Sequence, residues 1–296
     1  YLLMRNGRIA VFNREGAYQQ SLKSPVATSW TGYLREQGGR LFLGDYRSDF
    51  PWVFDDRRQG EAPGRFQQAA MVVADAERVY VSDRGNSRLQ VFDREQTDTP
   101  VVVFPLEARP GPVAIRNAEL ALVDEKNVLR VYTVEQDKFI LRSSLEIRQG
   151  AQAVALGPDQ TVYIAYRWGR NHGLCAYERK EGGWGEERVI APSIYESWPH
   201  YYPAGVPLVI GPDRQLWFAT DTNGTLASLD ITTDRVTERV KGVHRPLVVG
   251  FDAGETLYVG GFPSTRDKGP VLQRYSLNGE PLGAFGPPVL YEGDTP

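Results

Sequence analysis

The stretch ERVYVSDRGNSRLQVFDREQ, residues 77–96, contains two segments of alternating apolar and polar residues joined by a short turn. Alternation with a period of two is typical of a β-strand with one buried face. The turn contains Asp83 and Gly85, two residue types that favour tight turns. The second segment returns near the start of the chain, as RIAVFNREG at 8–16 against RLQVFDREQ at 88–96. The stretch is therefore one copy of an internal repeat.

The repeat continues along the whole chain. Its third strand has a large, mostly aromatic residue near its end, at positions 38 to 52 residues apart: Phe12, Phe54, Phe92, Tyr132, Tyr177, Leu229 and Tyr275. The preceding strand recurs as LFLGD, VYVSD, LALVD, VYIAY, LWFAT and LYVGG, and further apolar runs come before it. Four short strands in about 40–45 residues are the period of a β-propeller blade. The sequence thus predicts an all-β fold, a seven-bladed β-propeller of four-stranded antiparallel blades, whose strands we call a to d.

The two ends of the chain suggest how the blades are counted. The first repeat has strands b, c and d but no strand a before Tyr1. We expect Val289 to Tyr291 to supply the missing strand, so that the C-terminal strand closes the N-terminal blade and removes an exposed sheet edge. Residues 1–296 then form a single β-propeller domain. The alternative is a six-bladed ring with an irregular N-terminal extension.

The middle of each strand b is expected to be core. The positions that share this register are Phe42, Tyr80, Ala121, Tyr163, Trp217 and Tyr258.

Two segments resemble known repeat families. Residues 77–96 resemble an NHL repeat, and GPDRQLWFATDTNGTLASLDITTDRVTE, residues 211–238, is similar to the repeats of streptogramin (virginiamycin B) lyase-type propellers. The resemblance implies a propeller fold. It implies much less about function, because this architecture serves protein binding, RNA binding, lyases and lactonases.

Propeller geometry divides the loops between two faces. The a–b turns carry many acids, for which we expect turn-forming roles: Glu36, Asp75, Glu77, Glu119, Asp159, Asp213, Asp252 and Glu255. The b–c and d–a loops of the other face are rich in cations and aromatic residues, and the longest insertion, 191–205, is among them. We predict that this face binds the partner, through Arg47, Arg84, Arg167, Trp168, Arg170, His172, Trp198, His200, Tyr202, His244 and Arg245. Packing of the insertion's aromatic residues over the molecule itself is the structural alternative.

The sequence favours a non-catalytic interaction scaffold over an enzyme, because no convergent acid–base or metal set is visible. The alternative is a lyase or lactonase-like enzyme at the central axis, in which His200 and His244 act with a divalent cation. Lyase-type repeats often carry glutamate where Thr220 stands, which departs from that pattern. Otherwise no cofactor and no resident metal are expected. The aspartates that end strand b, Asp45, Asp83 and Asp124, are expected to bond the backbone amides of the following turn.

The composition limits the classes of partner that the protein is expected to bind. The net charge of −3 makes nucleic acid a poor candidate, so a protein or peptide is favoured and an acidic small molecule is the second option. No apolar run is long enough to cross a membrane. The single cysteine, Cys175, excludes an intrachain disulfide but does not decide the compartment. The chain starts within a repeat without a signal-peptide pattern, which suggests an excised or mature domain, with a periplasmic or extracellular location favoured.

Overall fold

The structure is a computed structural model in which every described element of secondary structure is a β-strand. It describes residues 2–3, 8–12, 18–23, 31–37, 40–45, 51–53, 61–67, 69–93, 99–168, 171–191, 208–220, 225–241, 246–251, 255–261 and 272–285. Only the backbone is described before residue 61 and at residues 69–70, 72, 74, 167–168, 171–172, 246–248, 260–261, 272 and 284–285. Within these ranges there is no helix, and hence none long and apolar enough to span a membrane. The chain divides into two compact units. Unit 1 comprises Tyr1–Ser29, Ser193–Tyr201 and Gly205–Pro296, and unit 2 comprises Trp30–Pro192 and Tyr202–Ala204.

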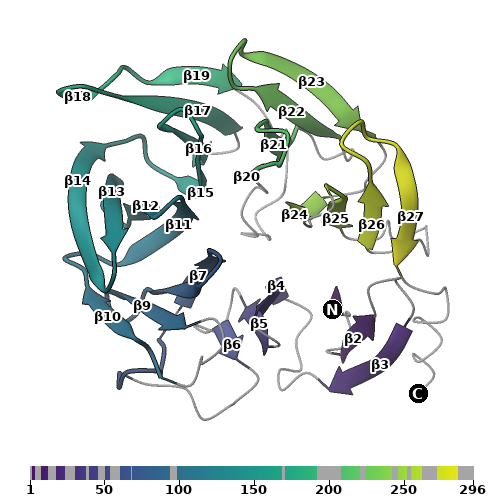
Figure 1. Cartoon of the computed structure of the whole chain (residues 1–296), viewed down its shortest axis with the longest axis horizontal. Helices are drawn as coiled ribbons and strands as arrows, with labels where there is room; N and C mark the ends of the chain where they lie inside the picture. Colours follow the sequence, from purple (N-terminus) through teal and green to yellow (C-terminus); the bar gives the residue numbers. More distant parts are fainter. Residues whose placement is uncertain are drawn as a thin grey trace. The chain divides into compact units, whose positions relative to one another are not determined.

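Unit 2 contains four sheets (Figure 1). The first has three described strands: β4 (Thr31–Gln37), β5 (Arg40–Asp45) and β6 (Pro51–Val53). The second consists of β7 (Ala69–Ala74), β8 (Arg78–Asp83), β9 (Arg88–Asp93) and β10 (Val102–Pro105). The third consists of β11 (Pro110–Arg116), β12 (Glu119–Asp124), β13 (Val128–Glu135) and β14 (Lys138–Glu146). The fourth consists of β15 (Ala151–Leu156), β16 (Thr161–Trp168), β17 (Asn171–Lys180), β18 (Gly183–Trp184) and β19 (Arg188–Ala191).

Unit 1 contains three sheets. The N-terminal sheet consists of β1 (Leu2–Leu3), β2 (Arg8–Phe12) and β3 (Tyr18–Lys23). The next consists of β20 (Leu208–Ile210), β21 (Leu216–Ala219), β22 (Leu226–Asp230) and β23 (Arg235–Val240). The last consists of β24 (Pro246–Phe251), β25 (Leu257–Gly261), β26 (Leu272–Tyr275) and β27 (Pro281–Phe285).

Each sheet is an antiparallel meander in chain order, except that β19 returns to pair with β17 beside the short β18. Successive strands therefore take the positions a to d that the repeat predicts. The N-terminal sheet contains three described strands, β1, β2 and β3, in chain order. Several sheets have four strands, which confirms the all-β class and the antiparallel four-stranded unit.

The predicted core register is confirmed at four described positions. Tyr80, Ala121, Tyr163 and Trp217 are at most 1% exposed. Tyr258 departs from the register because it is only partly buried, although its neighbours Leu257 and Val259 are fully buried. Tyr258 pairs with Gly250, which has no side chain to cover the ring. The side chain of Phe42 lies outside the described residues.

The acids of the a–b turns stabilise those turns and reach back to the buried aromatic residue of strand b. Asp75 accepts the amides of Glu77 and Arg78, and its other oxygen accepts the hydroxyl of Tyr80 at 2.9 Å. Burial and this bond raise the pKa of Tyr80 well above its usual value. Asp213 likewise accepts the amide of Gln215 and the indole Nε1 of Trp217. The predicted turn-forming role of these acids is confirmed at both positions.

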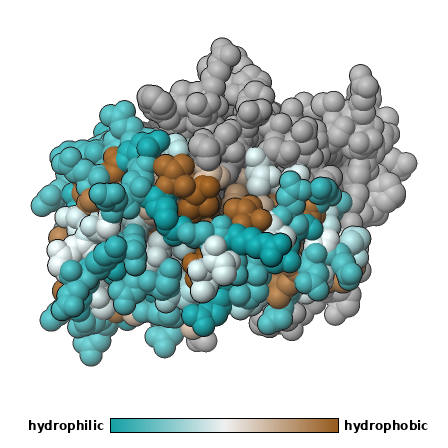
Figure 2. Space-filling model, turned by 90° about the horizontal axis from the view of Figure 1, so that it is seen from above, coloured by the Kyte–Doolittle hydropathy of each residue, from teal (hydrophilic) through white to brown (hydrophobic). Residues whose placement is uncertain are grey.

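Among the residues whose side chains the structure describes, the exposed large hydrophobic residues lie on or beside the last strand of their sheet. They are Val101, Val103, Leu141, Val189, Val236 and Leu282. Figure 2 shows one face of the molecule, on which hydrophilic residues predominate and hydrophobic residues form small groups. Scattered exposure of this kind is normal for a folded protein.

Candidate functional site

The predicted binding surface falls partly within the described residues. Arg167 and Trp168 end β16, and His172 begins β17. Arg167 pairs with His172 and Trp168 with Asn171, so three of the predicted residues meet at the end of one β-hairpin. Arg84 lies in the b–c turn between β8 and β9 and is exposed. The remaining predicted residues lie outside the described ranges: Arg47, Arg170, Trp198, His200, Tyr202, His244 and Arg245.

In unit 2, the b–c turns contact the d–a connections directly. The amide of Leu106 donates to the carbonyl of Ser87 at 2.8 Å, and that of Glu125 donates to the carbonyl of Arg109 at 2.9 Å. One sheet further along, the amide of Ile147 donates to the carbonyl of Asn127 at 2.9 Å. The two kinds of loop therefore lie side by side at the same end of these sheets, as the predicted division into two faces requires.

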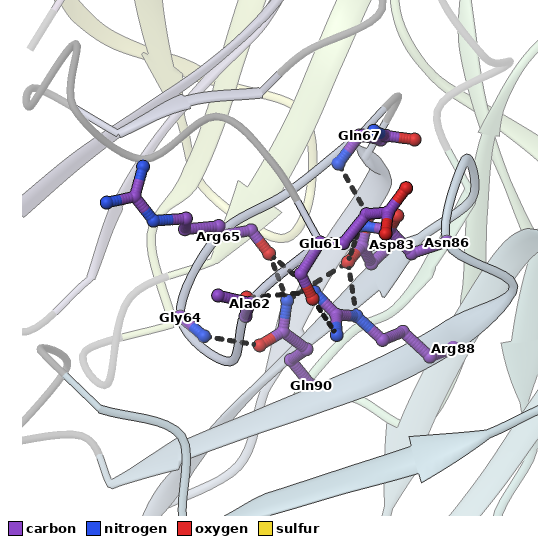
Figure 3. A network of polar contacts seen from close by, with 9 residues as sticks. All are labelled: Glu61, Ala62, Gly64, Arg65, Gln67, Asp83, Asn86, Arg88 and Gln90. Atoms are coloured by element: carbon purple, nitrogen blue, oxygen red, sulfur yellow. Dashed lines mark hydrogen bonds and ion pairs between the residues drawn. The ribbon is translucent and has the colours of Figure 1, made fainter.

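Asp83 forms the centre of a buried polar network at this end of the second sheet (Figure 3). Its Oδ1 accepts the backbone amide of Gln67 at 2.8 Å. Its Oδ2 accepts from Asn86 Nδ2, Arg88 Nε and Gln90 Nε2, at 2.9, 2.6 and 3.0 Å. Asp83 is 0% exposed, so both carboxylate oxygens are bonded within the protein. A buried charge needs such compensation.

Arg88 and Gln90 attach the connection 61–67 to the sheet. The Arg88 guanidinium donates to the carbonyls of Glu61, Ala62 and Arg65, at 2.6 to 3.1 Å. Gln90 Nε2 donates to the Arg65 carbonyl at 2.5 Å, and Gln90 Oε1 accepts the amide of Gly64 at 2.8 Å. The connection therefore has a fixed backbone without belonging to a strand over most of its length.

The role predicted for Asp83 is correct in kind but wrong in its partner. We expected the amides of the following turn, whereas its backbone partner is Gln67, sixteen residues earlier. The connection 61–67 folds back over the end of β8, so that the amide of Gln67 takes the place expected for an amide of the following turn. Asp124 does follow the prediction, because its Oδ1 accepts the amides of Lys126 and Val128, both at 2.9 Å. Asp45 ends β5, and its side chain lies outside the described residues.

The two aspartates reach arginines at different register positions. Asp83 is bonded to Arg88, the residue paired with it across the ladder, whereas Asp124 is bonded to Arg130, two residues further along β13. Arg130 occupies the register position that Gln90 occupies in β9. Both sheets therefore neutralise the carboxylate at the end of strand b with an arginine from strand c.

The corresponding position of the fourth sheet is Tyr166, which is 4% exposed. The Arg148 guanidinium lies 4.8 Å from the centre of its ring and forms an ion pair with Glu187. Burial raises the pKa of the Tyr166 hydroxyl. Cys175, in the same core, is 1% exposed, and burial raises the pKa of its thiol to about 12. A thiol with so high a pKa is not a reactive nucleophile at neutral pH.

The turns of this face present cations to solvent. Arg84, directly after Asp83, and Lys126, two residues after Asp124, are both exposed, while the two aspartates are buried. Sequence reasoning missed the polar network beneath them. The signal was visible, because Arg88 and Gln90 are two polar residues at alternate positions of a strand that is otherwise apolar up to Asp93.

Comparison with known proteins shows the fold. No protein family and no curated protein matches the chain. Among solved structures, a catalytically inactive virginiamycin B lyase from Staphylococcus aureus with quinupristin has a TM-score of 0.53 and 11% identity, over 85% of this chain and 82% of that one. A streptogramin B lyase has a TM-score of 0.52 and 9% identity, over 97% and 85%.

A 6-phosphogluconolactonase-like protein from Bacteroides uniformis has a TM-score of 0.54 and 13% identity, over 80% of this chain and 78% of that one. These solved structures therefore include both lyase and lactonase-like propeller proteins. At such low identity the likeness concerns the fold alone. The chain has the fold of a β-propeller and resembles the virginiamycin B lyase type in its architecture.

Proposed function

We propose that this protein is a non-catalytic interaction scaffold that binds its partner through the cationic and aromatic face formed by the b–c and d–a loops. One observation carries the proposal: the described carboxylates that end strand b, those of Asp83 and Asp124, are hydrogen-bonded to other groups of the protein. Asp83 is fully buried and accepts four hydrogen bonds, and Asp124 is 4% exposed and is bonded to Arg130 and two amides. Acids held in this way do not offer an open ligand position to a metal or a substrate.

The residue types that the loops of this face contain suit recognition. Arg84 and Lys126 are exposed cations, and Arg167, Trp168 and His172 belong to one hairpin end. Arginine and aromatic side chains dominate interface hot spots because they bury a large area and retain polar groups. A protein or peptide is the partner that this composition fits best, and an acidic small molecule is the second option.

An enzyme is the alternative function. It rests on His200 and His244, which precede strands a in the sequence as histidine does in the lyase-type repeats that the chain resembles. In that case the two imidazoles would act as general base or metal ligand for a divalent cation. A bound divalent ion, held by both histidines and a carboxylate, is the observation that would favour the enzyme over the scaffold.

The proposed surface is tested by affinity capture from a lysate with the wild type and with a Trp168→Ala/Arg170→Ala double variant. We expect the double variant to lose most of the captured partner, because both residues belong to the b–c loop that the sequence predicts to be part of the surface. A Lys138→Ala variant, at the opposite end of the third sheet, is the control and should capture normally. Equal capture by the double variant and the wild type would show that the partner uses another face.

The finer architecture is also a proposal. We infer one domain, residues 1–296, of seven blades, in which Val289 to Tyr291 adds strand a to the N-terminal sheet. The support is that the N-terminal sheet has three described strands, β1 to β3, which the sequence repeat assigns to positions b, c and d. A six-bladed ring with an N-terminal extension is the alternative. Val289 to Tyr291 lie outside the described residues.

Deleting residues 287–296 tests this closure. We expect the melting temperature of the whole domain to fall by several degrees, because the N-terminal sheet would lose its strand a and expose an unpaired edge. Thermal unfolding followed by circular dichroism measures the change. An unchanged melting temperature would refute the closure while leaving the binding proposal intact.

A further inference from the structure

Two side chains of the second sheet hold an irregular point of the third sheet in unit 2. The ladder between β11 and β12 shifts register between Pro110 and Val113, so β11 bulges at the residues between them. The Ser82 hydroxyl, from β8, donates to the carbonyl of Gly111 in this bulge at 3.1 Å. The Sδ atom of Met71, from β7, accepts the backbone amide of Val113 at 3.4 Å. The bulge therefore takes both a donor and an acceptor from the neighbouring sheet.

Met71 and Ser82 act from one place, because they are paired across the ladder between β7 and β8. Strands β7 and β11 lie side by side in unit 2 (Figure 1). Ser82 is 0% exposed and Val113 is 1% exposed, whereas Met71 is only partly buried. Met71 also packs against the apolar cluster that contains Tyr80 and Val113. Its thioether is therefore within reach of a small solute and at the same time part of the contact between two sheets.

We propose that Met71 is a modification site, at which a hydroperoxide oxidises the thioether to a sulfoxide and thereby loosens the contact between β7 and β11. In the reaction with hydrogen peroxide, a lone pair of the sulfur bonds to one oxygen and the O–O bond breaks. The other oxygen leaves as water after taking up the hydrogen of the first. Sulfur is oxidised and the peroxide is reduced, so no further reactant is needed.

Oxidation removes the acceptor from a buried amide. A thioether is a weak acceptor, and its sulfur becomes electron-poor once it is bonded to oxygen. The distance of 3.4 Å between Sδ and the Val113 nitrogen is too short to hold a further oxygen between them. Because Val113 is 1% exposed, water does not replace the lost acceptor. The sulfoxide should therefore move β7 and β11 apart or leave the amide unpaired, and both changes weaken the junction.

The other sulfur atoms of the chain can be distinguished from that of Met71. Met4 is the only other methionine, and it lies outside the described residues. Cys175 is 1% exposed, and burial raises the pKa of its thiol to about 12. Oxidation of cysteine follows its thiolate character and its exposure, so this thiol should react slowly. Peptide mass spectrometry assigns an added oxygen to one of the three residues.

The junction lies next to the loops of the predicted binding face. Ser82 directly precedes Asp83, and Pro110, where the bulge begins, pairs with Asp124. A displacement of β11 should therefore reach the d–a connection 106–109, which leads into this strand. The inference itself does not depend on the proposed binding function, because the oxidation and its effect on the sheets are measured without a partner.

The test uses the full chain with Met4→Leu, in which Met71 is the remaining methionine, treated with hydrogen peroxide. Peptide mass spectrometry should find one added oxygen on the peptide that contains Met71. The melting temperature should fall by about 2 °C or more, as expected when a buried amide loses its acceptor. Amide hydrogen exchange should become faster in 109–116 and stay unchanged in Lys138–Glu146, the last strand of the same sheet.

Met4→Leu/Met71→Leu is the matched control, because leucine keeps a similar apolar volume but has no sulfur to oxidise. Peroxide should change neither its melting temperature nor its exchange. The wild type is treated in parallel, with Met4 and Met71 resolved on separate peptides, so that the result does not depend on how well the Met4→Leu variant folds.

Three results would overturn the proposal. The first is a folded protein in which Met71 resists peroxide under conditions that oxidise it in the denaturant-unfolded chain. The second is complete oxidation of Met71 with an unchanged or higher melting temperature, since the sulfoxide oxygen would then have replaced the thioether as acceptor. The third is an equal loss of stability in peroxide-treated Met4→Leu/Met71→Leu, which would place the damage at another residue.

Discussion

Replacing Trp217 with alanine is expected to lower the free energy of unfolding by about 3–5 kcal/mol. Trp217 is 0% exposed, and its ring lies edge-on to Phe251 with the ring centres 5.6 Å apart. Its Nε1 donates to Asp213, which also holds the a–b turn. The substitution therefore opens a cavity in the core of unit 1 and leaves a turn carboxylate without one of its partners.

Denaturant unfolding followed by circular dichroism measures how far Trp217→Ala lowers the free energy of unfolding. Val236→Ala is the control in the same sheet, because Val236 is 43% exposed and its truncation leaves no internal cavity. A loss below about 1 kcal/mol for Trp217→Ala would mean that the site collapses around the missing side chain, against the close packing expected of a core.

Replacing Arg88 with alanine should have an effect of similar size, about 3–5 kcal/mol, because it leaves Asp83 as a buried charge without its ion-pair partner. The Arg88–Asp83 distance is 2.6 Å, and Asp83 is 0% exposed. The variant also removes the donors to the carbonyls of Glu61, Ala62 and Arg65. The connection 61–67 should become more sensitive to limited proteolysis.

Two further variants isolate the cause at Arg88. Arg142 is the surface control, since its ion pair with Glu135 is about half exposed on both sides and Arg142→Ala should cost less than about 1 kcal/mol. Adding Asp83→Ala to Arg88→Ala removes the unpaired buried carboxylate. The free energy of unfolding of the double variant should therefore fall by less than the sum of the decreases in the two single variants. Equal losses for Arg88→Ala and Arg142→Ala, or strictly additive losses, would contradict the buried network.

The alternation of apolar and polar residues was sufficient to predict the strands and many of the buried positions. Alternation along 77–96 predicts that Tyr80 is buried, and the same register predicts that Trp217 in unit 1 is buried; both residues are at most 1% exposed. The register fails at Tyr258, whose burial depends on what stands opposite it, and the opposing residue is Gly250. A repeat predicts which way a side chain points but not how completely its neighbours cover it.

The candidate site was less predictable because its contacts are long-range. Asp83 was recognised as structural, but its bond to the Gln67 amide depends on how the connection folds back. The donors Arg88 and Gln90 were not singled out, although two polar residues on the buried face of a strand indicate a partner nearby. The exposure of Arg84 beside a hidden Asp83 follows only from this network.

The central claim is that the b–c and d–a loops form the binding face, and amide hydrogen exchange on the captured complex tests it most directly. The account predicts slower exchange, on partner binding, in the connection 61–67 and in the turns 83–88, 124–128 and 167–172. The a–b turns at 75–78 and 157–161 should exchange as in the free protein. Protection confined to those a–b turns, with the b–c turns unchanged, would contradict the account.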